Sequence, residues 1–74
     1  MKLPRITGER AIRALKKAGF EEVGVRGSHH YLYHAGRGAI VTIPVHAGKT
    51  LAPKTLQTIL FQAGLSVDEF RTLL

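Results

Sequence analysis

The chain has 74 residues and a formal net charge of +6, with 11 lysines and arginines against five acids. We expect one domain, residues 1–74, with a small core, because about 60 residues bury only about 60% of their unfolded surface. The chain has no cysteine, which excludes disulfides and thiolate metal sites, and no apolar run long enough for a signal peptide or membrane span. These features predict a cytoplasmic protein without a membrane partner, whose charge attracts a phosphate backbone or an acidic protein surface.

The first periodic segment predicts an amphipathic helix. Thr7 is a suitable N-cap, apolar residues recur at helical spacing from Ala11, and Gly19 is placed to end the helix. The opposite face is basic and carries Arg10, Arg13, Lys16 and Lys17. A solvated surface explains that face as well as a binding surface does.

Three alternating runs then predict three short strands. They cover Phe20–Arg26, His29–His34 and Ala39–Val45, with a turn at Gly27-Ser28 and a hairpin loop at Gly36-Arg37-Gly38. Pro44 lacks an amide donor, so the third strand should weaken there or face an edge of the sheet.

Two helices are predicted after the strands. The first begins at Pro53, a residue suited to a first turn, and carries one apolar stripe from Leu56 to Ala63. Ser66 and Glu69 have the spacing of a capping box, which predicts a last short helix.

The predicted order is α-β-β-β-α with a short C-terminal helix, which is an α+β fold. A three-stranded antiparallel sheet with two helices on one face would bury the apolar stripes and leave the other face to solvent or a partner. This layout resembles the double-stranded-RNA-binding-domain fold, although a fold alone does not assign a function.

Four histidines suggest a metal site, but strand geometry argues against one. His30 and His34 point to the same face of their strand and lie about 13 Å apart at ~3.3 Å per residue. Zinc ligands lie at about 2 Å from the ion. The sequence offers no dense acid cluster to complete a site, so we expect no metal and no cofactor.

Acid–base catalysis by one histidine requires fewer groups than a metal site. Imidazole exchanges a proton near neutral pH, and RNA carries its own nucleophile, the 2′-hydroxyl. A base that removes the hydroxyl proton promotes attack on the adjacent phosphate, while nearby cations stabilise the developing charge.

The histidine that faces outward depends on the register of the hairpin. With a two-residue loop, Leu32 lies opposite Val41 and His29 faces outward. With a three-residue loop, Tyr33 lies opposite Val41, and His30 faces outward in place of His29. The pattern leaves both registers open. His34, near the hairpin tip, is interpreted as an ordinary surface residue.

One more histidine lies close to the pair in either register. His46 falls across from Gly27 or Ser28, so we expect it to be the second polar group of the site or a loop anchor.

Three linked segments resemble the HicA family of type II toxins. They are Gly27-Ser28-His29-His30, the strand Val41–His46, and the stretch from Thr55 to Leu65. The resemblance covers almost the whole chain from the first helix onward. It implies a metal-independent mRNA endoribonuclease (an mRNA interferase) of double-stranded-RNA-binding-like fold, the toxin component of a toxin–antitoxin system, neutralised by a HicB-type antitoxin.

The resemblance also suggests site residues. The family's histidine usually follows Gly-Ser directly, which corresponds to His29, and in some members comes one place later, which corresponds to His30. Lys49 matches a frequent basic position, and Lys54 stands where members commonly have glycine. The remaining candidates are Gly27 and Ser28, which would position the histidine, and Arg26, Tyr31 and Lys54, which would contact RNA.

Two other functions fit the same sequence. A non-catalytic RNA-binding module of the same fold would use the same charge. A docking face for an acidic protein would also explain the basic surface, and it is compatible with the toxin interpretation.

Overall fold

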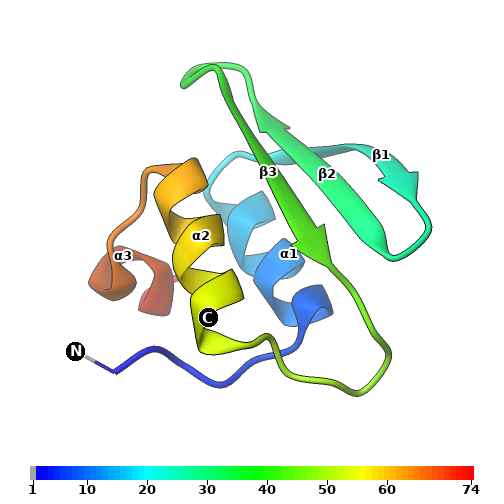
Figure 1. Ribbon diagram of the computed structural model, residues 1–74. Coiled ribbons are helices and arrows are strands. Elements are labelled where there is room, and N and C mark those ends of the chain that lie inside the picture. The colour runs from blue at the N-terminus through cyan, green and yellow to red at the C-terminus, as the bar shows by residue number, and fades with distance from the viewer. Residues whose placement is uncertain (1) are drawn as a thin grey trace.

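The computed structural model describes residues 2–74, and it confirms the predicted α+β order. The elements are α1 (Gly8–Lys17), β1 (Glu21–Arg26), β2 (His29–His34), β3 (Ala39–Pro44), α2 (Pro53–Ala63) and α3 (Val67–Arg71). The strands form one antiparallel sheet in the order β1-β2-β3. Helices α1 and α2 lie on one side of it, and α3 lies beside α2 (Figure 1). None of the helices in the described residues is long and apolar enough to cross a membrane.

The core lies between the sheet and the helices. Its largest fully buried side chains come from every layer and are Leu15, Leu32, Val41, Ile43, Leu56, Ile59 and Phe70. Close approach is required where α1 begins, because a Cβ on Gly8 would collide with the carbonyl oxygen of Pro44. A glycine at this position therefore lets α1 start directly beneath the end of β3.

The sheet has the register in which Leu32 pairs with Val41. This is the register predicted for a loop at Gly36-Arg37, and these two residues are the central residues of the turn. Pairing ends at His34 and Ala39, so the connection has four residues, 35–38. The amide of Arg37 donates to the His34 carbonyl (3.2 Å) and the amide of Gly38 donates to the Ala35 carbonyl (3.3 Å), which closes this turn before the strands can extend further.

The first strand is shorter and less covered than predicted. Phe20 lies outside β1 and is buried in the core, and a β-bulge interrupts the pairing between Glu22 and Gly24. No residue of β1 is buried, and Val23 and Val25 are each 56% exposed. This strand is therefore held mainly by its pairing with β2.

Helix α2 is fastened to the other edge of the sheet. The edge strand is β3, as the position of Pro44 predicted. Its Thr42 amide donates to the Gln62 side-chain oxygen (3.4 Å), and the Arg37 guanidinium donates to the carbonyls of Ala63 and Gly64 (3.2 Å each). These bonds fix the C-terminal end of α2 against β3 and the hairpin turn.

The predicted capping box is present at the start of α3. The Ser66 amide donates to Oε1 of Glu69 (2.8 Å), and the Glu69 amide donates to Oγ of Ser66 (3.0 Å). These bonds to Ser66, with a smaller contribution from the charge of Arg37, hold the pKa of Glu69 below its ordinary value of 4.5.

Candidate functional site

The alternation of β2 sorts its histidines onto two faces of the sheet. Leu32 is fully buried beneath the helices, so His30 and His34 point to the same side. His29 and Tyr31 point to the face that no helix covers. Of the two registers left open by the sequence, the one found is the register that turns His29 outward.

His29 lies in a row across one end of the open face. It pairs with Arg26 on β1 and with Pro44 on β3, and directly paired residues share a face. The His29 side chain is exposed and has no hydrogen-bond partner within residues 2–74. The row therefore presents a free imidazole beside a guanidinium.

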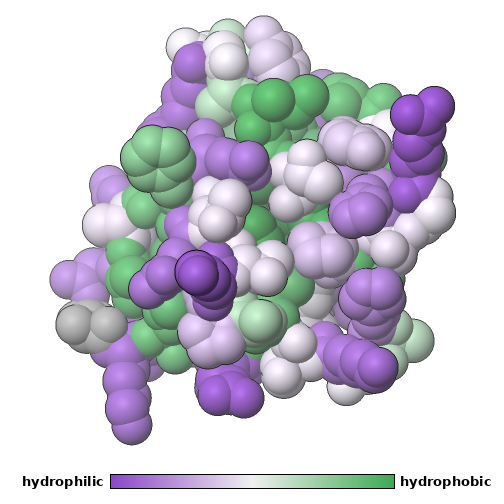
Figure 2. Space-filling model, viewed as in Figure 1, coloured by the Kyte–Doolittle hydropathy of each residue, from purple (hydrophilic) through white to green (hydrophobic). Residues whose placement is uncertain are grey.

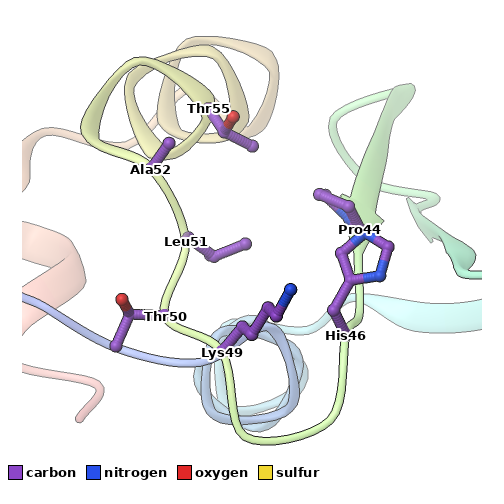
Figure 3. Close-up of a pocket in the computed structure, with 7 residues that line it drawn as sticks. All are labelled: Pro44, His46, Lys49, Thr50, Leu51, Ala52 and Thr55. Atoms are coloured by element: carbon purple, nitrogen blue, oxygen red, sulfur yellow. The ribbon is translucent and has the colours of Figure 1, made fainter.

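A pocket of about 270 Å³ adjoins this row, between the end of β3 and the start of α2. Pro44, the partner of His29, forms one wall, and His46, Lys49 and Thr55 supply polar groups. Figure 3 shows the His46 ring and the Lys49 ammonium directed toward the same space. No carboxylate lines the pocket, so its ionisable groups carry only positive or neutral charge.

The surface around these residues is mainly hydrophilic. Figure 2, in the view of Figure 1, shows hydrophilic residues over the right-hand side of the molecule, where the β1–β2 turn and the loop after β3 lie. The pocket and the histidine row thus form one polar, cationic end of the sheet.

A comparison with protein families matches residues 8–65 to the HicA toxin of bacterial toxin–antitoxin systems. This match spans more than half of the chain, from α1 past the end of α2. The chain belongs to the HicA toxin family. A comparison with curated proteins finds no match. The matched segment of this HicA-family toxin includes the histidine row and the whole pocket, and it ends before α3.

The second histidine of the pair is engaged on the opposite side of the sheet. Nδ1 of His30 lies 2.7 Å from Oε2 of Glu22, and the other oxygen of Glu22 lies 3.7 Å from Nζ of Lys16 on α1. A carboxylate only accepts hydrogen bonds, so Nδ1–H of His30 donates here. The sequence did not indicate this pair, because the bulge in β1 shifts the pairing between Glu22 and Gly24.

His34 is a packing residue, and its interpretation as an ordinary surface residue was wrong. Its ring meets Phe20 edge to face with centroids 5.1 Å apart, and its Nδ1 accepts a hydrogen bond from the Arg37 amide (3.1 Å). A Cβ on Gly19 would lie 2.9 Å from Nε2 of His34. The glycine that ends α1 therefore also makes room for this ring.

The first turn of α2 leaves its amides without a side-chain cap. Ala52 occupies the N-cap, Pro53 follows, and the first turn contains no acid. The positive end of the helix dipole therefore points toward the pocket side uncompensated. Lys54 is exposed and lies outside the set of pocket-lining residues.

Five of the predicted site residues thus fall into two adjoining groups. His29, Arg26 and Tyr31 share the open face, and His46 and Lys49 line the adjoining pocket, with Pro44 common to both. His30 lies on the helix side and Lys54 stands apart on α2. Within residues 2–74, no three histidine, aspartate or glutamate side chains gather in a way that could hold a metal ion.

Proposed function

We propose that this HicA-family toxin is an endoribonuclease that cleaves mRNA and uses His29 as its proton-transfer residue. The observation that carries the proposal is the exposed, unbonded imidazole of His29 between Arg26 and a cationic pocket. The net charge of +6 supports a polyanionic substrate.

The chemistry follows from the substrate's own nucleophile. Neutral His29 accepts the proton of a ribose 2′-hydroxyl, whose oxygen then attacks the neighbouring phosphorus. Arg26 and Lys49 stabilise the negative charge that develops on the phosphate. Because the attacking group belongs to RNA, the reaction needs no metal-bound water and no cofactor.

Gly27 and Ser28 would position the catalytic histidine. Gly27 has φ 58, a left-handed conformation that suits the tight turn between β1 and β2. The carbonyl of Ser28 accepts a hydrogen bond from the Val45 amide (2.7 Å), which ties the turn to the strand leading into the pocket. Both residues thus support the start of β2, where His29 stands.

RNA would lie across the open face. Arg26, Lys49 and Lys54 would contact phosphates, and Tyr31 would stack on a base. Tyr31 is half-buried on the central strand, and a Cβ on the neighbouring Gly24 would lie 4.0 Å from its ring, so the glycine leaves one side of the ring open.

A HicB-type antitoxin is the proposed protein partner. An acidic antitoxin surface over Arg26 and the pocket would neutralise the cations that hold RNA and block access to His29. The family assignment supports an antitoxin in general.

The test is cleavage of mRNA by the purified chain in the presence of a chelator. We expect wild-type protein to cut RNA and His29→Ala to lose about 10²- to 10⁴-fold in rate, the usual contribution of one acid–base group. Expression of the wild type alone should arrest growth, and expression of the variant should not. If both proteins bind RNA equally and neither cuts it, the non-catalytic RNA-binding function replaces this proposal.

A further inference from the structure

We propose that His46 is the second proton-transfer residue, the general acid that protonates the departing 5′ oxygen of RNA. This inference rests on the proposed ribonuclease function and adds a residue to it. It begins from a feature that the His29 mechanism leaves unused, a second imidazole in the adjoining pocket.

The backbone brings the two histidines to one end of the sheet. His29 pairs with Pro44, and the Val45 amide bonds to the Ser28 carbonyl, so the chain stays alongside β2 beyond the end of β3. Val45 packs against the core, whereas Pro44 and His46 both line the pocket. Figure 3 shows the His46 ring next to Pro44. Pro44 therefore lies between the two imidazoles.

This separation suits one phosphate. Two residues of chain place the Cα of His46 at most about 7 Å from that of Pro44, and the His46 ring turns back toward Pro44 (Figure 3). Each imidazole reaches about 3 Å to the atom with which it exchanges a proton. A phosphodiester seated over Pro44 would have His29 near its 2′ oxygen and His46 near its 5′ oxygen.

The proposed step balances with these two residues alone. Neutral His29 takes the 2′-hydroxyl proton as the bond between the 2′ oxygen and phosphorus forms. The bond from phosphorus to the 5′ oxygen breaks, and protonated His46 gives that oxygen its proton. The products are a 2′,3′-cyclic phosphate and a 5′-hydroxyl end, and the histidines return to their starting forms by proton exchange with water.

The pocket brings one further cation to His46. Lys49 in the same loop is the other ionisable residue of its lining, and no carboxylate lines it. The first turn of α1, which carries Glu9, lies against Pro44 and Val45. A phosphate seated in the pocket would lie where the imidazole of His46 and the ammonium of Lys49 can both donate hydrogen bonds to its oxygens.

The experiment compares two RNA substrates that differ in the leaving atom. One has the ordinary 5′ oxygen at the bond that the wild type cuts, and the other has sulfur there, a leaving group that needs no proton. We expect His46→Gln to slow cleavage of ordinary RNA by about 10²- to 10⁴-fold and to cut the sulfur substrate within about tenfold of wild type. His29→Gln, which lacks the base, should be slow on both.

The outcomes separate this inference from the proposed function. If His46→Gln slows the cleavage of both substrates equally, or of neither, His46 is not the general acid. Cleavage by the wild type would still support the ribonuclease function in that case. If wild type cuts neither substrate, the ribonuclease proposal itself fails. A second measurement needs no variant. Because a general acid acts in its protonated form, the wild-type rate on ordinary RNA should fall at high pH, and the rate on the sulfur substrate should not. The same alkaline fall on both substrates would overturn the inference.

Discussion

Histidines on the two faces of β2 have different surroundings. On the helix side, His30 bonds to Glu22 and His34 packs on Phe20, so both rings have partners. On the open side, His29 stands free beside Arg26. A step of one residue along a strand thus separates a histidine that is held from one that is available for chemistry.

The largest expected difference between the faces is in stability. Leu32→Ala removes a fully buried side chain and should lower the free energy of unfolding by about 2–5 kcal/mol. Tyr33→Ala, its neighbour on the open face, should lower it by about 1 kcal/mol or less, since Tyr33 is 40% exposed. Urea unfolding measures both, and equal losses would contradict the assignment of faces.

A smaller effect tests whether the His34 ring is packed. Gly19→Ala should destabilise by about 2–3 kcal/mol, because Gly19 has φ 100 and its new Cβ would press on the ring. Gly38→Ala is the control, with φ 63 and open space around it, and should lose only about 1 kcal/mol.

Thermal unfolding ranks the two glycine variants. Adding His34→Ala to Gly19→Ala should recover the steric part of the loss. Equal melting temperatures for Gly19→Ala and Gly38→Ala would mean that the ring does not occupy this space.

The smallest effect concerns the pH dependence of stability. The lowered pKa of Glu69 means that its charged form stabilises the folded state above 4.5, and that this contribution is lost as pH falls through the lower folded-state pKa. Wild type should therefore melt above Glu69→Gln at neutral pH, and the two should converge in stronger acid. A gap that persists in acid would contradict this sign.

Most of the fold was predictable because its signals are local. The cap at Thr7, the stripe of α2 and the capping box at Ser66 depend only on nearby residues, and each is confirmed. The hairpin register was not predictable, because the alternation of β2 fits two registers. Only the packing of the helices determines that the face with Leu32 is the buried one. The end of the pairing at His34 and Ala39 was not predictable, because it depends on hydrogen bonds within the turn, to His34 and Ala35.

The place of single candidate residues in the fold was partly predictable from the sequence, but their grouping was not. The position of His29 at the start of β2 follows from the Gly-Ser turn. The separation of Lys54 from the pocket depends on how α2 is placed. The hydrogen bond between His30 and Glu22 depends on the bulge in β1. Neither leaves a periodic signal in the sequence.

The central claim is that the free face of β2, not its helix side, carries the chemistry. The most direct measurement is the RNA cleavage rate of His29→Gln and His30→Gln side by side, with circular dichroism to confirm that both are folded. The account predicts a loss of about 10²- to 10⁴-fold for His29→Gln and less than about tenfold for His30→Gln. The reverse order, with His30→Gln inactive and His29→Gln active, would contradict it.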